Sequence, residues 1–195
     1  MHLISIPATA LTLALMLLWS SAGADVPSAE AQVRETMDAV IAVLKDNALS
    51  ADEKDTRLRA LVDERFDFRA MAQRTLGKEW KPASTEEQTR FIELFREQLA
   101  RTYLSAITTY TDERVDVTKE TIKDNRYAQV DTSIIAKDKS IPVNYRLYLR
   151  GEDWFVYDVV IEGASLVRNY RTSYQGIVKK QGMGTLLAQM EEKLQ

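Results

Sequence analysis

The chain of 195 residues has no cysteine, and its only histidine is His2. Without cysteine it cannot form disulfides, thiolate metal sites or a thiol nucleophile. Because His2 lies in the apolar N-terminal segment 1–24, residues 25–195 contain no imidazole at all. This excludes Ser-His-Asp and Cys-His catalysis there and removes the commonest zinc ligand. The fold must therefore be stabilised by packing alone.

Charge of one sign does not dominate either. The sequence has 26 Lys and Arg against 29 Asp and Glu, a formal net charge of −3. No basic stripe is interleaved with stacking aromatic residues along the chain, so nothing predicts nucleic-acid binding.

Residues 1–24 contain no Asp, Glu, Lys or Arg, so only the α-amine and His2 could supply positive charge there. An apolar run from Leu3 to Trp19 leads to Ala22-Gly23-Ala24, the small-x-small pattern of a secretory cleavage site. The run is shorter than the ~20 residues of a membrane-spanning helix, although an uncleaved anchor is the alternative interpretation. We predict removal of 1–24, leaving 25–195 as one exported, soluble domain with a substantial core.

Apolar periodicity predicts helices over about 28–47, from Ala51 onwards, from Asp67 to Leu76, over 85–110 and over 164–181, with a last helix after Gly182. Ser50 with Glu53, and Ser84 with Glu87, form capping boxes. The 85–110 helix has a stripe of aromatic and large aliphatic residues. This stripe covers a sheet or, in the alternative interpretation, lines a cavity.

The alternation of side chains between two faces predicts four strands, over about 114–119, 126–136, 140–150 and 153–162. Short connections, such as Gly151-Glu152, indicate an antiparallel meander in an α+β fold. The fourth strand is apolar on both faces, with Trp154 and Val156 on one and Val159 and Ile161 on the other. Both faces therefore need a cover.

A catalytic interpretation rests on Asp131 and Asp158 as candidate general bases, with Tyr127, Tyr145 and Tyr157 as oxyanion donors in a curved-sheet isomerase. No spacing of these common residues demands such chemistry. Gly163-Ala164-Ser165 lacks the full G-x-S-x-G of a nucleophile elbow, and no histidine activates the serine. Ser165 is predicted to be a helix cap.

Three segments carry a family resemblance: FDFRAMAQRTLGKEWKPAS at 66–84, TEEQTRFIELFREQLARTY at 85–103 and WFVYDVVIEGASLVRNYR at 154–171. Together they resemble the MlaC family of periplasmic phospholipid-binding proteins, also described as toluene-tolerance auxiliary proteins. The resemblance implies a mixed fold in which helices and the sheet, here four antiparallel strands by the alternation above, enclose a deep apolar pocket. Phospholipid is the expected cargo, and no cofactor is expected.

The resemblance also implies partners. They are an outer-membrane MlaA-like lipoprotein–porin complex and an inner-membrane ABC transporter with an MlaD-like MCE-domain subunit. The chain is expected to be a monomer that moves phospholipid between them and so maintains outer-membrane lipid asymmetry. A purely structural or chaperone-like role and the isomerase remain the alternatives.

Periodicity and family position together predict the pocket walls. The predicted lipid-binding residues are Phe91, Phe95, Leu99, Tyr103, Ile107, Val143, Tyr145, Leu147, Val156, Val159, Leu166, Tyr170 and Tyr174. Arg168 and Arg171, one helical turn apart, form either a rim for a head group or partner, or a solvated helix face.

Overall fold

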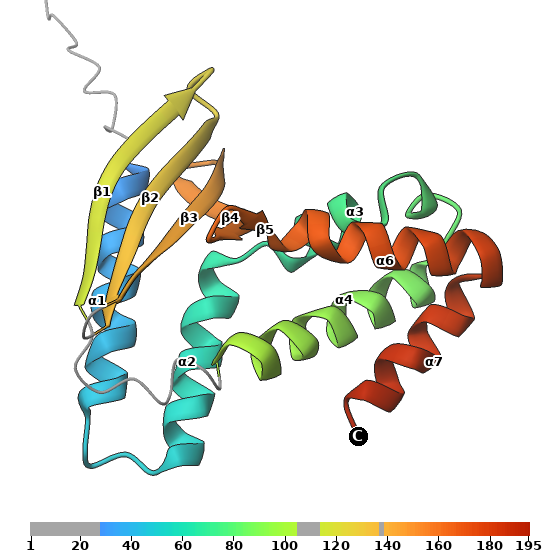
Figure 1. Ribbon diagram of the computed structural model, residues 1–195, viewed down its shortest axis with the longest axis horizontal. Coiled ribbons are helices and arrows are strands. Elements are labelled where there is room, and N and C mark those ends of the chain that lie inside the picture. The colour runs from blue at the N-terminus through green and yellow to red at the C-terminus, as the bar shows by residue number, and fades with distance from the viewer. Residues whose placement is uncertain (1–27, 105–113, 137–138) are drawn as a thin grey trace, which may run out of the picture.

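The computed structural model describes residues 28–104, 114–136 and 139–195. Figure 1 shows a sheet with α1 and α2 on one side of the molecule and a group of helices on the other. The helices are α1 (Ala29–Lys45), α2 (Ala51–Arg65), α3 (Phe68–Leu76), α4 (Thr85–Leu99), α6 (Leu166–Gln181) and α7 (Met183–Lys193). A 3₁₀ turn, η1 (Gly77–Glu79), follows α3, and a π-helical turn, η2 (Ala100–Leu104), follows α4.

The predicted segment 1–24 and the end of the predicted 85–110 helix, including Ile107, lie outside the described residues. None of the described helices combines the length and the apolar character that crossing a bilayer requires.

Local hydrogen bonds explain where the helices begin. The Ser50 hydroxyl accepts from the Glu53 amide at 3.3 Å, and the Ser50 amide donates to the Glu53 carboxylate at 2.8 Å. Ser84 and Glu87 repeat this arrangement at the start of α4. The Asp67 carboxylate accepts from the Ala70 amide at 2.7 Å and begins α3. These caps satisfy amides that have no partner within a helix, and all three predictions are confirmed.

The sheet is antiparallel in the order β1-β2-β3-β4-β5. Its strands are β1 (Arg114–Lys123), β2 (Tyr127–Ala136), β3 (Lys139–Arg150), β4 (Asp153–Ile161) and β5 (Ala164–Ser165). The four predicted strands are therefore present, with a two-residue fifth. The last long helix begins at Leu166 rather than 164, because Ala164 and Ser165 pair with the end of β4.

A β-bulge in β4 changes which residues share a face. Leu147 pairs with Val156 but Arg146 pairs with Asp158, so Tyr157 is an extra residue on β4. A bulge shifts the alternation by one position. Val159 therefore lies on the same face as Val156, and the prediction that these two residues face opposite sides is wrong.

α1 packs against β1 and β2, and α2 lies beside α1. They cover the face of the sheet that we call the inner face. Its central side chains are buried: Ala128, Val130, Val143 and Leu147 are 0–5% exposed. The outer face carries the alternate residues of the same strands.

The aromatic stripe of α4 packs on helices, not on the sheet. Phe91 meets Tyr174 edge-on at a centroid distance of 5.8 Å, and Phe95 meets Tyr170 in the same way at 5.3 Å. The chain after β5 folds back, so that α6 and α7 cover α4 (Figure 1). The prediction that this stripe covers a sheet is therefore wrong.

Thr75, at the buried side of α3, offers a test of this helical packing. Its side chain is fully buried, and within the described part of the chain its hydroxyl has no hydrogen-bond partner. An unsatisfied buried hydroxyl costs free energy that an isosteric methyl avoids. We expect Thr75→Val to raise the free energy of unfolding by about 1 kcal/mol. Urea denaturation measures this change, and a loss of stability would show that the hydroxyl has a partner.

Candidate functional site

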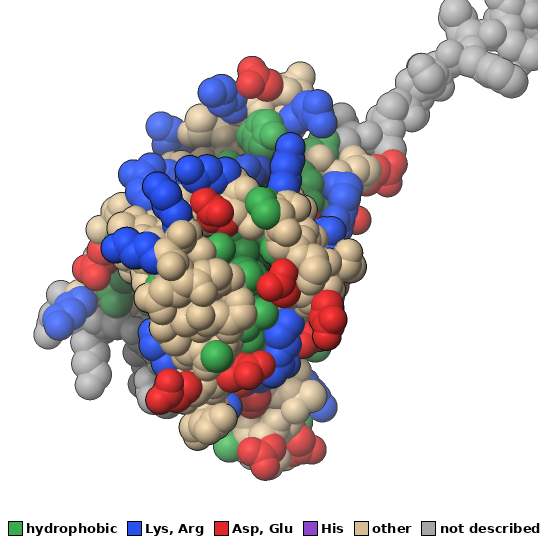
Figure 2. All heavy atoms as spheres, turned by 90° about the vertical axis from the view of Figure 1, so that its right-hand side faces the viewer, with side chains coloured by type: hydrophobic (Ala, Val, Ile, Leu, Met, Phe, Trp, Pro, Cys, Tyr) green, Lys and Arg blue, Asp and Glu red, His purple; other side chains and the backbone are tan. Residues whose placement is uncertain are grey.

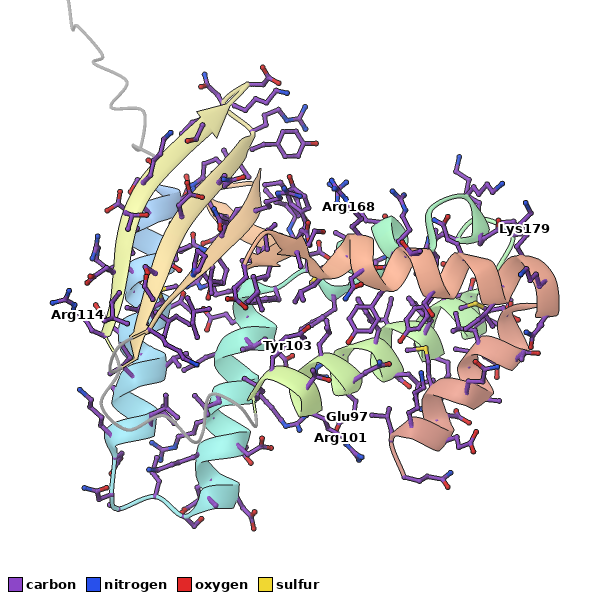
Figure 3. All side chains as sticks on the ribbon, viewed as in Figure 1. Glu97, Arg101, Tyr103, Arg114, Arg168 and Lys179 are labelled. Atoms are coloured by element: carbon purple, nitrogen blue, oxygen red, sulfur yellow. The ribbon has the colours of Figure 1, made fainter. Side chains whose placement is uncertain are left out.

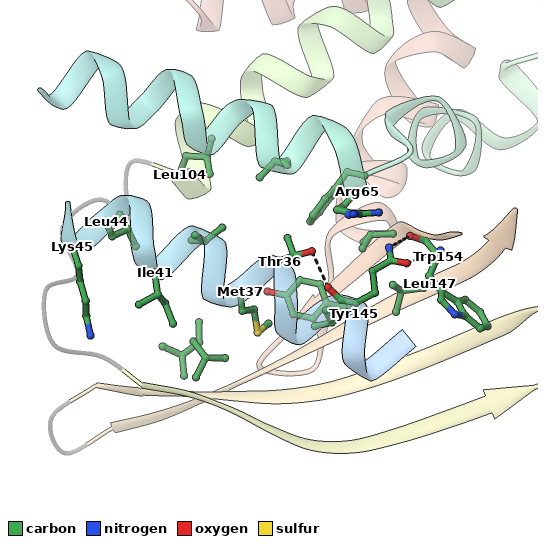
Figure 4. A pocket seen from close by; sticks show the side chains of 18 residues that line it. Thr36, Met37, Ile41, Leu44, Lys45, Arg65, Leu104, Tyr145, Leu147 and Trp154 are labelled. Carbon is green, nitrogen blue, oxygen red and sulfur yellow. Dashed lines mark hydrogen bonds between the residues drawn. The ribbon is translucent and has the colours of Figure 1, made fainter. Parts of the chain in front are cut away.

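An apolar cavity of ≈ 190 Å³ lies between α1, α2 and the inner face of the sheet (Figure 4). Helix α1 supplies most of one wall, and β3 and β4 supply much of the other. The lining residues are Gln32, Val33, Thr36, Met37, Val40, Ile41, Leu44, Lys45, Val62, Arg65, Phe66, Leu104, Val115, Ile134, Tyr145, Leu147, Trp154 and Val156.

One end of this pocket is closed by a two-way hydrogen bond between α1 and β4. The Gln32 side-chain amide donates to the Trp154 carbonyl at 2.6 Å, and the Trp154 amide donates to the Gln32 side-chain carbonyl at 3.0 Å. Nearby, Arg65 pairs with Glu64 at 3.0 Å and with Asp153 at 3.5 Å. The polar groups at this end are therefore bonded to protein, which leaves the apolar side chains to meet a ligand.

The other end of the pocket lies near Leu44, Lys45 and Leu104 (Figure 4). Leu104 ends the π-helical turn that follows α4. Such turns add a residue to a helical repeat and often occur at functional sites. Here the turn carries the chain from the helical group to the pocket wall. Lys45 is exposed at this end and is one of two cationic residues in the lining.

Tyr145 places a hydroxyl in this apolar wall. Burial raises the pKa of Tyr145 to about 12, because a phenolate would lose its hydration. The side chain is therefore a neutral O–H donor throughout the physiological range. Within the described residues, no hydrogen bond to this hydroxyl is present, so it is available to an oxygen atom of a ligand.

The raised pKa of Tyr145 predicts a loss of stability at alkaline pH. The folded protein holds this proton more tightly than the unfolded chain, whose tyrosine pKa is about 10. The protonated Tyr145 side chain therefore stabilises the folded protein. This stabilisation is fully present below pH 10 and is lost as the pH rises through about 12. When the pH rises from 9 to 11, the free energy of unfolding should fall by on the order of 1 kcal/mol more in the wild type than in Tyr145→Phe. Urea denaturation at both pH values tests this, and equal losses would contradict it.

The structure separates the predicted lipid-binding residues into groups. Tyr145, Leu147 and Val156 line the pocket. Val143 and Val159 are buried in the same inner face but are not among the lining residues. Ile107 lies outside the described residues.

The other predicted positions belong to the helical group and do not line this pocket. They are Phe91, Phe95, Leu99, Tyr103, Leu166, Tyr170 and Tyr174. Tyr103 lies in η2 where α4 approaches α2 (Figure 3). Burial, and to a smaller extent nearby Tyr170, raise its pKa. The aromatic rings of this group fill space among α4, α6 and α7 by packing on one another.

Sequence reasoning missed the α1 wall. Val33, Met37, Val40, Ile41 and Leu44 recur at helical spacing, the pattern that predicted the helix itself. The signal was present as an aliphatic stripe, but no feature of the pattern distinguishes a stripe that meets a cavity from one that meets a packed core.

Of the residues of the catalytic interpretation, Tyr145 lines the pocket, but Tyr127 and Tyr157 do not. Neither Asp131 nor Asp158 lines it. Asp158 is 4% exposed. Its carboxylate accepts hydrogen bonds from Arg146 at 3.0 Å, from the Ser165 hydroxyl at 2.7 Å and from the Val167 amide at 3.1 Å. Ser165 caps α6 by accepting from the Arg168 amide at 3.1 Å, as predicted. In the described ranges, no cluster of carboxylate or imidazole groups could hold a metal ion.

Arg168 and Arg171 lie on α6, on the opposite side of the sheet region from the α1 wall, and neither lines the pocket. Figure 3 shows Arg168 pointing away from the ribbon. The rim role at the pocket remains a prediction without support from the geometry.

These features define an α+β protein that holds an apolar cavity between a curved antiparallel sheet and two helices. A sequence profile of the MlaC protein family matches residues 34–192. The chain belongs to the MlaC family.

Known proteins agree with this assignment. The chain is 27% identical over 124 residues to the intermembrane phospholipid transport system binding protein MlaC of Haemophilus influenzae, which covers 61% of this chain and 58% of that protein. It is 24% identical over 103 residues to the toluene tolerance protein ttg2D of Pseudomonas putida, which covers 52% and 48%. The chain thus matches about half the length of these curated relatives.

A solved structure matches over a larger share. It is a phospholipid-binding protein from Ralstonia solanacearum in complex with a phospholipid, with a TM-score of 0.78 and 25% identity. The match covers 86% of this chain and 97% of that chain.

Proposed function

We propose that this chain is a periplasmic carrier that binds phospholipid acyl chains in the pocket between α1, α2 and the sheet. The observation that carries the proposal is the mainly apolar lining of the cavity, in a fold shared with a protein solved with a phospholipid. The pocket wall includes Tyr145, Leu147 and Val156 from the predicted set and the α1 stripe that the sequence did not assign to it.

A carrier moves the acyl chains of a phospholipid from one apolar environment to another. Two long acyl chains hide roughly thirty methylene groups from water, worth on the order of 25 kcal/mol at ~0.8 kcal/mol each. A bilayer hides them equally well. A carrier therefore needs a wall about as apolar as membrane, and the direction of net transfer depends on its partners. The proposal needs no cofactor and no reacting group.

The cavity is smaller than the roughly 300–1,000 Å³ that is usual for ligand pockets. Full acyl chains therefore require α1 and α2 to move away from the sheet or the ligand to extend past the Lys45 end. The aliphatic side chains of α1 suit such a change, because their contacts with the sheet are nondirectional.

The wider proposal follows the family. Residues 1–24 act as an export signal, and the exported monomer exchanges phospholipid with an MlaA-like lipoprotein–porin complex and with an MlaD-like MCE-domain subunit of an ABC transporter. This exchange maintains the lipid asymmetry of the outer membrane. Enzymatic turnover is not part of the proposal, since the acidic candidates lie outside the pocket.

The test is organic extraction of the gently purified protein followed by mass spectrometry. We expect phospholipid in amounts comparable to the protein, and none after a chromatography step that strips lipid with detergent. A protein that carries no lipid, and takes up none from phospholipid vesicles, would overturn the proposal. Assays of Asp131→Asn and Asp158→Asn variants address the isomerase, because lost turnover in either would support it.

A further inference from the structure

The charges of this protein are unevenly placed. Residues 68–81 and 166–181 contain eight basic side chains and one acidic side chain, Glu79. The rest of the chain contains 18 of the 26 basic residues and 28 of the 29 acidic ones. The two segments therefore carry a formal net charge of +7, whereas the rest of the chain carries −10.

The fold joins these two segments into one surface. They form α3, η1 and α6, and α3 and α6 pack against each other. At their junction, a β-carbon built on Gly77 would lie 3.0 Å from the Arg171 guanidinium, so η1 and α6 are in contact. We call the Lys and Arg side chains of 68–81 and 166–181 the basic face. Figure 2 shows Lys and Arg gathered on the upper part of the side where these helices lie.

The basic face is not neutralised within the protein. All eight of its cationic side chains are exposed. In the described part of the chain, none of them is within ion-pair distance of a carboxylate, whereas Arg residues elsewhere make such pairs repeatedly. Unpaired charges of one sign on neighbouring helices repel one another. Their grouping suits a ligand that supplies the opposite charge.

An aromatic cluster on the outer face of the sheet continues this surface. It consists of Tyr127, Tyr148, Phe155 and Tyr157, whose rings contact one another at centroid distances of 6.1–6.3 Å. Arg74 of the basic face stacks on Tyr157 at 4.2 Å from the ring centroid, so the two features meet. We call these four rings the aromatic patch.

The composition of this combined surface favours a protein partner over a bilayer. Arg and aromatic side chains are the residues enriched at protein–protein hot spots. The rings are held in place, since Arg150 stacks on Phe155 at 3.8 Å and Tyr148 donates to Asp67. Membrane-surface helices instead expose a row of Leu, Phe or Trp side chains that insert among lipids. Of the large apolar residues described, only Ile122 and Tyr127 are exposed.

We propose that the basic face and the aromatic patch together form a docking surface for an acidic surface of a protein partner. The inference rests on the proposed function, which requires docking at membranes, and it assigns that docking to α3, α6 and the outer sheet face rather than to the pocket end. Complementary charge accelerates encounter, and the aromatic patch supplies buried area in the complex.

The experiment measures binding of the purified chain to two probes from the same organism: the MCE-domain subunit as a soluble domain and the lipoprotein–porin complex in detergent. One test variant is Arg74→Glu/Arg171→Glu. A second, Arg168→Glu/Lys179→Glu, alters only α6 side chains that point outward (Figure 3). The matched control is Arg57→Glu on α2 with Lys139→Glu at the start of β3, which makes the same change in charge at exposed positions outside the basic face and the aromatic patch.

We expect the wild type to bind at least one probe, and more weakly at 300 mM than at 50 mM salt. Each test variant should bind about tenfold more weakly, or worse, while the control stays within about twofold. Tyr157→Ala should weaken the same complex without changing its salt dependence.

Three outcomes would overturn the inference. The test variants could bind as well as the control, the wild type could bind neither probe, or the basic face could instead govern binding to phosphatidylglycerol vesicles or to a second copy of the chain. Lipid extraction from every variant separates the two proposals. Unchanged lipid content with unchanged binding rejects the docking surface alone, whereas absence of lipid in the wild type rejects the proposed function.

Discussion

Replacing Val40 with tryptophan removes phospholipid from the purified protein. Val40 lines the pocket from α1, and the indole occupies much of a cavity of ≈ 190 Å³ without introducing charge. Overpacking typically costs ~1–3 kcal/mol, and here the cost falls on the lipid-bound state. Because 1.4 kcal/mol is a factor of ten, we expect at least about a tenfold fall in phospholipid per protein. Extraction and mass spectrometry measure it.

Ala42→Trp is the matched control for this prediction. Ala42 is on the same helix but is exposed, so the same ring is added on the side away from the sheet. The control should keep the lipid content and the unfolding midpoint of the wild type. Normal lipid content in Val40→Trp, with the protein folded, would show that acyl chains bind elsewhere. The aromatic group of α4 and α6 would then be the next candidate, as the sequence predicted.

Local signals explain why most helices and strands could be predicted. Ser50 and Ser84 cap helices through their own side chains, and Ser165 caps α6 where the sequence placed it. Gly151 and Gly163 adopt the positive φ that their turns require. Each of these features depends on a few neighbouring residues, so the sequence contains the information in one place.

The pocket depends on contacts between distant segments, and the sequence carries little information about these. The rings of α4 were predicted as rigid cavity walls, yet Phe95 and Phe91 meet edge-on partners, Tyr170 and Tyr174, that lie 75 and 83 residues later in the chain. Such pairs close the space that a cavity would need. Among the described residues, the aliphatic stripe of α1 contributes to no such pair of rings, and the cavity lies along it.

The β-bulge at Tyr157 is a second feature that could not be predicted from the sequence. One extra residue cannot be recognised in a strand that is apolar on both faces, because either alternation fits the pattern equally well. The bulge changes which residues of β4 lie on the inner face, where the pocket is. The shift brings Val159 to the inner face, and it brings Asp158 to the outer face beside Arg146, where it meets the start of α6.

Asp158→Ala is expected to produce the largest loss of stability among these variants. The carboxylate is 4% exposed and joins three elements: Arg146 on β3, the Ser165 hydroxyl and the Val167 amide at the start of α6. Alanine leaves the guanidinium and two donors without this acceptor. Breaking a buried ion pair costs about 3–5 kcal/mol, and the low end applies here because the Arg146 side chain is 34% exposed.

Urea denaturation of Asp158→Ala and of Asp131→Ala tests whether Asp158 stabilises the protein by joining β3 to the start of α6. The alternative is that loss of any carboxylate on the outer face has the same effect. Asp131 accepts from Gln129 and Asn144 on the partly exposed outer face, so its loss should cost about 1 kcal/mol or less. Equal losses in the two variants would contradict this joining role of Asp158. Because α6 carries half of the basic face, a loosened α6 should also weaken partner binding in Asp158→Ala while the pocket, built on α1 and the inner face, still holds lipid.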